Sequence, residues 1–112
     1  MSDVSNPAEV LLAAGVLPMA PGPYLGRYIL QRRGISPEAA AHDIGIAPEF
    51  MRGLLDDRIA IDRPLAIRLG AYSGTTAEFW LTLQEAWSYA NEIVKPSDRS
   101  RYIQIDPYTP GD

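Results

Sequence analysis

The short interval between two predicted helices in the middle of the chain constrains the fold more than any other feature. Ser36 and Pro37 are typical of a helix start, because a serine caps free amide groups and a proline fits the first turn. Gly45 ends this helix, and Pro48 opens the next one, predicted over 49–55, so only three residues remain for the turn. Two short helices joined this tightly must cross at a steep angle, which is typical of a helix-turn-helix motif.

Three further helices are predicted around this pair. They cover residues 23–33, 62–72 and 76–94, and in each of them apolar side chains recur at helical spacing. Asp62 is predicted to cap the second of the three. With the central pair they make five helices, and we expect an all-α fold.

The long helix over 76–94 is predicted to start with a capping box formed by Thr75 and Glu78. Its apolar arc, with Trp80 at one edge, is wider than a small core can bury. The tryptophans are compatible with an ordinary core, but an exposed patch of this size is seldom left bare, so we predict a dimer seam on this helix. The residues predicted for the dimer interface are Trp80, Gln84, Trp87 and Asn91.

The two ends of the chain are predicted to lie outside this domain. Residues 1–21 form an N-terminal extension with one or two helical turns over 7–16, and residues 22–95 form the domain itself. Residues 96–112 form an irregular C-terminal tail with one β-prone run over 102–105. That run has no partner within the tail, so it is expected either to be frayed or to pair with the edge of a partner protein.

Composition excludes several classes of function. The chain has no cysteine and a single histidine, so we expect no disulfide, no metal site and no cofactor built on these side chains. The first basic residue is Arg27 and the apolar runs are short, so neither an export signal nor a membrane span is expected, and the protein is predicted to be cytoplasmic. The net charge of −4 argues against indiscriminate coating of polyanions. No catalytic constellation is present, so the chain is not expected to be an enzyme.

One run at the start of the long helix is highly specific. It reads Gly74, Thr75, Thr76, Ala77, Glu78, Phe79, Trp80, Leu81, Thr82, Leu83 and Gln84. Shorter pieces recur in the same order along the chain, namely Pro21-Gly22, Gly34-Ile35-Ser36, Ile44-Gly45-Ile46, Leu54-Leu55, Ile61-Asp62 and Ala66-Ile67-Arg68-Leu69. Together they resemble the HigA/VapI-type antitoxins, a branch of the lambda-repressor-like (XRE) helix-turn-helix regulators. The resemblance spans residues 21–87, over half of the chain.

The resemblance implies a five-helix, lambda-repressor-like domain and a dimeric DNA-binding protein. Such proteins neutralise a neighbouring toxin, usually a small ribonuclease, and repress their own operon. The second helix of the motif would lie in the major groove, and paired subunits would match the two half-sites of a palindromic operator. Phe50 is then either buried by the domain or in contact with a thymine methyl group. The residues predicted to bind DNA are Ser36, Pro37, Ala47, Pro48, Glu49, Phe50, Arg52 and Arg58.

A second hypothesis keeps the fold without base reading. Glu49, Asp56 and Asp57 place three acids on or beside the helix that would enter the groove, and these acids oppose phosphate. Asp56 and Asp57 are otherwise expected to form a solvated helix end. The protein would then be an interaction module that neutralises a toxin or acts as an adaptor, and operator-like DNA would bind weakly or not at all.

Overall fold

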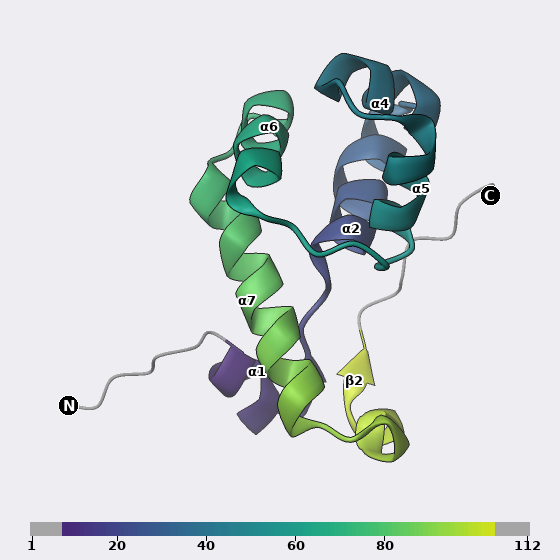
Figure 1. The fold of residues 1–112 in the computed structure, drawn as a ribbon. Helices are drawn as coiled ribbons and strands as arrows, with labels where there is room; N and C mark the ends of the chain where they lie inside the picture. Colours follow the sequence, from purple (N-terminus) through teal and green to yellow (C-terminus); the bar gives the residue numbers. More distant parts are fainter. Residues whose placement is uncertain (1–7, 105–112) are drawn as a thin grey trace.

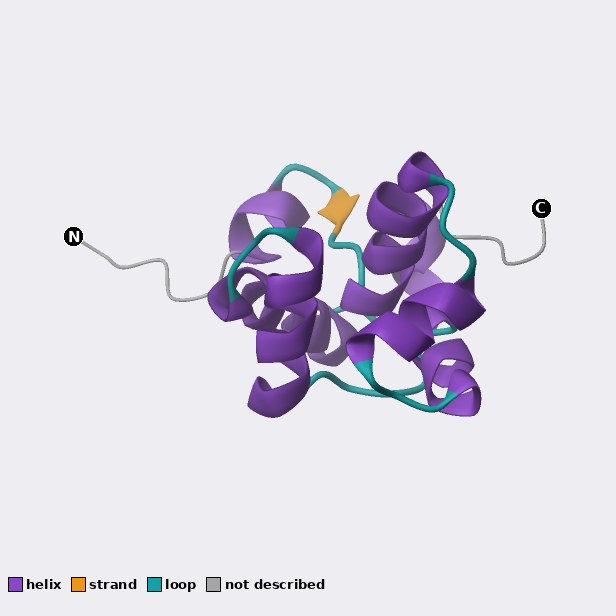
Figure 2. Ribbon diagram, turned by 90° about the horizontal axis from the view of Figure 1, so that it is seen from above, coloured by secondary structure: helices purple, strands orange, loops and turns teal. Residues whose placement is uncertain are grey.

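The computed structural model describes residues 8–104 of the chain. The helices and strands are, in chain order, α1 (Ala8–Ala13), β1 (Val16–Leu17), α2 (Pro21–Tyr24), η1 (Leu25–Leu30), α3 (Gln31–Arg33), α4 (Pro37–Ile44), α5 (Pro48–Leu55), α6 (Arg63–Ser73), α7 (Ala77–Ile93), η2 (Pro96–Arg101) and β2 (Ile103–Gln104). In Figure 1, α7 runs along the molecule, with α4, α5 and α6 towards one end and α1 and β2 at the other. Helices dominate the described residues (Figure 2), which confirms the all-α prediction.

The first helix of the domain is one continuous helix built from α2, η1 and α3. It begins at Pro21, two residues earlier than predicted, because Pro21 occupies the first turn after the extended Ala20. Its middle part, η1, has the wider turns of a π-helix. Gly34 ends the helix in the left-handed conformation, with φ of 67°. With this helix counted once, the five predicted helices are all present.

Side-chain caps begin the helices largely where the sequence predicts. The Ser36 hydroxyl accepts a hydrogen bond from the Ala39 amide at 3.1 Å, and the Asp62 carboxylate accepts one from the Leu65 amide at 3.0 Å. Such caps satisfy amide groups that have no partner within the helix. They fix the starts of α4 and α6 and confirm both predictions.

The start of α7 differs from the prediction by one residue. Thr76, not Thr75, is the cap, and its hydroxyl accepts from the Phe79 amide at 3.1 Å. The Thr75 hydroxyl instead accepts a hydrogen bond from the Trp80 indole Nε1 at 2.9 Å. The predicted capping box is therefore wrong, because the first of the two threonines serves the core and leaves the second to cap the helix.

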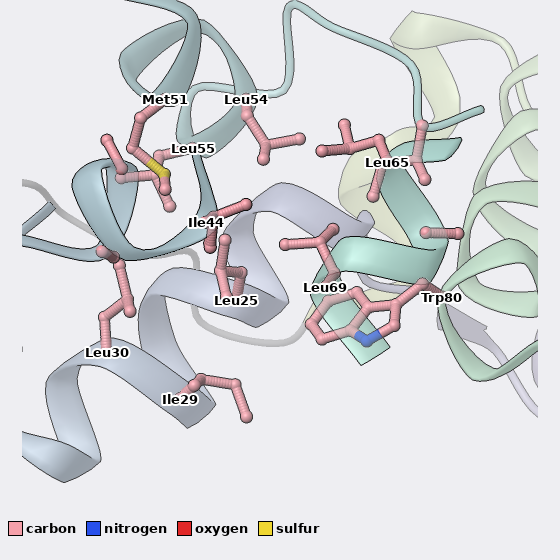
Figure 3. Packing of buried hydrophobic residues seen from close by; sticks show 14 residues of the cluster. Leu25, Ile29, Leu30, Ile44, Met51, Leu54, Leu55, Leu65, Leu69 and Trp80 are labelled. Atoms are coloured by element: carbon pink, nitrogen blue, oxygen red, sulfur yellow. The ribbon is translucent and has the colours of Figure 1, made fainter. Parts of the chain in front are cut away.

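The main core lies between the first helix, α4, α5, α6 and the beginning of α7. Trp80 is its largest member and is 0% exposed. Figure 3 shows its indole beside Leu69, and the rings of Tyr24 and Phe79 meet it edge-on at 5.7 and 5.3 Å between centroids. The buried members are Leu25, Ile29, Leu30, Ala40, Ala41, Ile44, Met51, Leu54, Leu55, Ile61, Leu65, Ala66, Leu69 and Trp80.

A second, smaller core joins the two ends of the described chain to α7. Leu17, Ala90 and Val94 form it, with Leu12 and Tyr102 packed against them. Strands β1 and β2 pair in parallel, with Val16 opposite Ile103 and Leu17 opposite Gln104. The segment 7–16 contains the predicted helical turns as α1, although Asn6 and Pro7 lie outside the described residues.

The prediction for the C-terminal tail was wrong in two respects. Residues 96–101 are not irregular but form the 3₁₀-helix η2. The β-prone run is neither frayed nor paired with a partner over 103–104, because β1 of the same chain is its partner; Ile105 lies outside the described residues. No helix between residues 8 and 104 has both the length and the apolar character needed to span a membrane.

Candidate nucleic-acid interface

Helices α4 and α5 form the predicted helix-turn-helix motif. The turn is closed by the amides of Gly45 and Ile46, which both donate to the Ala41 carbonyl, at 2.9 and 3.0 Å. Gly45 has φ of 88°, a conformation in which glycine carries no steric cost. The inner face of α5 is buried through Met51, Leu54 and Leu55. Burial of this face leaves the opposite face of α5 at the surface.

The eight residues predicted to bind DNA gather on this pair of helices and in its turns. Ser36 and Pro37 begin α4, Ala47 directly precedes α5, and Arg58 lies in the turn that follows α5. Pro37 is half-buried. The other seven are exposed, namely Ser36, Ala47, Pro48, Glu49, Phe50, Arg52 and Arg58. The predicted set thus lies on the two helices of the motif and directly beside them, and most of it is open to solvent.

Phe50 had two predicted environments, and the structure excludes one of them. Its side chain is 39% exposed on α5, so the domain does not bury it. An exposed aromatic ring on this helix is an apolar surface that can contact the methyl group of a thymine.

The charges on this surface are mixed. Arg58 forms an ion pair with Asp56, with 3.0 Å between Nη2 and Oδ2, and both side chains are largely solvent-exposed. Exposed pairs of this kind contribute little to stability, so a phosphate group can replace Asp56 as the partner of Arg58 at low cost. Arg52 adds a second exposed guanidinium, and Glu49 an acid in the first turn of α5.

Asp57 does not belong to a solvated helix end, which corrects the prediction for this residue. It is half-buried and has φ of 60°, in the left-handed region that aspartate adopts more readily than most residues. Its carboxylate lies close to the indole of Trp87 on α7. Burial raises the pKa of the Asp57 carboxyl above its ordinary value, and the nearby indole N–H of Trp87 and the charge of Arg99 offset part of that rise.

We expect Asp57→Asn to raise the free energy of unfolding at neutral pH. Because the pKa of Asp57 is raised by folding, the ionised carboxylate lowers stability above the folded pKa, and this penalty is lost as pH falls through the folded pKa towards the ordinary value of 3.8. Asparagine keeps a hydrogen-bond acceptor and tolerates the left-handed backbone. Urea unfolding should show a gain over the wild type at about pH 7 that shrinks towards about pH 3.

The matched control is Asp56→Asn, which removes the exposed neighbouring carboxylate. It should show no such gain at neutral pH, because only the exposed pair with Arg58 is lost. A stability for Asp57→Asn equal to that of the wild type throughout the pH series would contradict the argument from burial.

Comparison with known proteins places the chain in a family. No protein-family model matches it. An uncharacterised helix-turn-helix transcriptional regulator of Escherichia coli K12, YddM, is 35% identical over 76 residues, which cover 68% of this chain and 80% of the relative. Antitoxin HigA-1 of Vibrio cholerae is 33% identical over 88 residues, covering 70% of this chain and 83% of the antitoxin. The chain belongs to the HigA family of helix-turn-helix antitoxins.

Solved structures agree with this assignment. The Pseudomonas aeruginosa protein PA4674, in complex with an 18-base-pair operator DNA, matches with a TM-score of 0.66 at 33% identity, covering 70% of this chain and 85% of that protein. Antitoxin HigA of the same organism, with the higBA promoter, matches with a TM-score of 0.62 at 29% identity, covering 70% and 97%. Antitoxin GraA matches with a TM-score of 0.64 at 32% identity, covering 70% and 86%.

The dimer seam predicted for this HigA-family chain is wrong for Trp80, which is fully buried in the main core and cannot reach a second copy. The other three residues already have partners within the chain. The Gln84 side chain accepts from the Ile61 amide at 2.8 Å, the Trp87 ring lies under the guanidinium of Arg99, and Asn91 accepts from Arg99. Their place in a dimer interface stays a prediction.

Arg68 of this HigA-family chain makes a contact that the sequence did not predict. It lies on α6, and its guanidinium donates to the carbonyls of Ile44 and Gly45 at the end of α4. The only signal in the sequence was its position in the run Ala66-Ile67-Arg68-Leu69, which carries the family resemblance without indicating a role.

The described residues hold no group of three or more histidine or acidic side chains arranged for a metal ion. His42 is a surface residue, with its side chain 91% exposed and its Nδ1 3.6 Å from the Asp43 carboxylate. The chemistry of this surface is therefore that of exposed guanidinium, carboxylate and aromatic groups on a short helix.

Proposed function

We propose that this protein is an antitoxin-type transcription regulator that binds a palindromic operator as a homodimer, represses its own operon and neutralises a cognate toxin. The observation that carries the proposal is the match, at a TM-score of 0.66 and 33% identity, to a Pseudomonas aeruginosa protein in complex with operator DNA. We assign DNA binding to the unit of residues 22–95 and place its action in the cytoplasm.

The exposed residues of α5 fit the edges of base pairs in the major groove. Arg52 and Arg58 match guanine edges or phosphate oxygens, because guanidinium groups donate to both. Glu49 can accept from the amino group of a cytosine, and Phe50 can contact a thymine methyl. At the start of α4, Pro37 has no N–H and the Ala39 amide is bonded to Ser36, which leaves the Glu38 amide for a backbone phosphate.

We expect Arg52→Ala to weaken operator binding by about 1 to 3 kcal/mol, the usual size of one specific arginine contact. Fluorescence anisotropy with a labelled duplex from the region upstream of the gene measures this. The matched control is Arg101→Ala on η2, which removes an exposed arginine 3.9 Å from Asp98, away from the motif. Unchanged affinity in Arg52→Ala would remove this residue from the interface.

A salt series on the wild-type protein tests the proposed function itself. Neutralised phosphates release counterions, so affinity should fall steeply and log-linearly as salt rises, with a slope that reports the number of phosphate contacts. Arg52→Ala should reduce that slope by about one if Arg52 binds phosphate, and leave it unchanged if Arg52 reads a base. An undetectable complex at low salt would contradict DNA binding and favour an interaction module on the same fold.

The homodimer and the toxin complex are tested separately from DNA binding. Sedimentation of the purified chain should give twice the monomer mass, because a palindromic operator presents two half-sites to two subunits. Co-expression with the product of the adjacent reading frame should give a co-purifying complex and restore growth. Growth arrest in spite of co-expression would contradict the antitoxin role.

A further inference from the structure

The turn between α4 and α5 is held by a side chain from α6. Nη1 of Arg68 donates hydrogen bonds to the carbonyl groups of Ile44 and Gly45, each at 3.1 Å. Carbonyl groups at the end of a helix have no partner within that helix, so the guanidinium satisfies the end of α4. The approach is close, since a Cβ on Gly45 would lie 2.9 Å from the same nitrogen. Arg68 thereby fixes the turn that leads into α5.

The turn that follows α5 lies beside a side chain of α7. Asp57 is in this turn, half-buried, and its carboxylate is close to the indole of Trp87. The guanidinium carbon of Arg99, on η2, lies 5.3 Å from the centroid of the Trp87 ring and extends this contact to the C-terminal segment. Arg99 also bonds to Asn91 on α7.

We propose that Arg68 and Trp87 are positioning residues that set the direction of α5 for sequence-specific DNA recognition, acting on the turns before and after it. The inference rests on the proposed function. Helix α5 has eight residues, and a helix of this size is only about 12 Å long. Its direction therefore depends on what fixes its ends. Neither Arg68 nor Trp87 is among the residues that face the groove.

A purely stabilising role for the two residues predicts a different pattern of DNA binding. A smaller folded fraction lowers the affinity for every duplex equally, so the preference for operator over scrambled DNA stays constant. A tilted α5 loses contacts to base edges but keeps the non-specific attraction to phosphate, so the preference falls. The ratio of the two affinities thus separates positioning from stability.

The experiment uses the full chain, two variants and two matched controls. Arg68→Ala removes the two bonds to the turn, and Arg63→Ala is its control on the same helix, where the lost partner is the exposed Glu78. Trp87→Phe removes the indole N–H but keeps a ring, and Tyr89→Phe is its control, since it removes the O–H bonded to Glu9 of α1. If Arg68→Ala does not fold, Arg68→Lys is measured instead by the same criteria.

Both variants should lower the operator-to-scrambled affinity ratio on the order of tenfold while binding to scrambled DNA stays within about twofold of the wild type. Both controls should leave the ratio unchanged. Equal losses on the two duplexes, or an unchanged ratio in the variants, would overturn the proposal.

Hydrogen exchange of the free protein makes the test independent of DNA. In Arg68→Ala and Trp87→Phe, amide protection should fall within residues 46–58 and stay at the wild-type level in α6 and α7. A uniform loss over all helices, or none in α5, would overturn positioning. If the wild type does not prefer operator DNA, the proposed function fails, and the exchange pattern still decides whether the two residues hold α5.

Discussion

Replacing Gly22 by alanine should cost about 3 kcal/mol of unfolding free energy or more, the upper range for overpacking in a core. A Cβ at this position would lie 1.6 Å from the Leu54 carbonyl oxygen and 2.7 Å from its carbonyl carbon. These are backbone atoms of α5, so no side-chain rotation relieves the overlap. The first helix and α5 would have to separate, which exposes the main core. Urea unfolding followed by circular dichroism measures the loss.

The matched control is Gly53→Ala, within α5 itself. A Cβ there meets only the side chain of Ile59, whose Cδ1 lies 2.8 Å away at the flexible end of the residue. Alanine also gains about 1 kcal/mol of helix propensity over glycine. Gly53→Ala should therefore be close to the wild type in stability. A Gly22→Ala variant as stable as the wild type would contradict the close contact between the backbones of the first helix and α5.

Trp80→Ala should lower the free energy of unfolding by about 3 to 5 kcal/mol, the usual cost of truncating a fully buried tryptophan. The indole fills the centre of the main core, and its Nε1–H bond to the Thr75 hydroxyl is lost as well. Trp80→Phe keeps a ring in the same place and should cost less. Thermal and urea unfolding of both variants measure the difference.

The same variant separates a core residue from a dimer contact. If Trp80 formed the dimer seam, Trp80→Ala would give a folded monomer with nearly wild-type unfolding. Burial within the subunit predicts instead that folding itself is lost or weakened, whatever the state of association. Sedimentation together with circular dichroism distinguishes the two, and a stable, folded monomer would contradict the core assignment.

The helices could be predicted because their signals are local. Ser36 and Asp62 cap helices in the structure, as predicted from the sequence. The prediction was possible because a cap and the amide that it satisfies are only three residues apart. The start of α7 failed because Thr75 and Thr76 are equally good caps locally. The choice between them is made by Trp80, whose indole takes Thr75. Helical periodicity placed Trp80 at the edge of the apolar face of this helix. It could not show that Trp80 is fully buried, because spacing does not indicate which other helices pack against each side.

The candidate site also combines features that are local in the sequence, and could be predicted, with long-range contacts that could not. The predicted DNA-facing residues follow from their positions on and beside the two short helices of the motif, and the structure leaves seven of the eight exposed. Two contacts could not be predicted, that of Arg68 with Ile44 and that of Asp57 with Trp87. Each joins residues far apart in the chain, and a local sequence pattern does not indicate such contacts. The parallel pairing of β1 with β2 was missed as well. The two strands are far apart in the chain, and each has only two residues, too few for a pattern.

The pairing of β1 with β2 has a consequence for how the folded protein opens locally. These strands lie near opposite ends of the described residues, so their contact closes a loop around nearly all of the helical domain. The main core contains residues only between Leu25 and Trp80 and needs neither strand. Local opening that separates β1 from β2 therefore frees the segments before α2 and after α7 without exposing the main core.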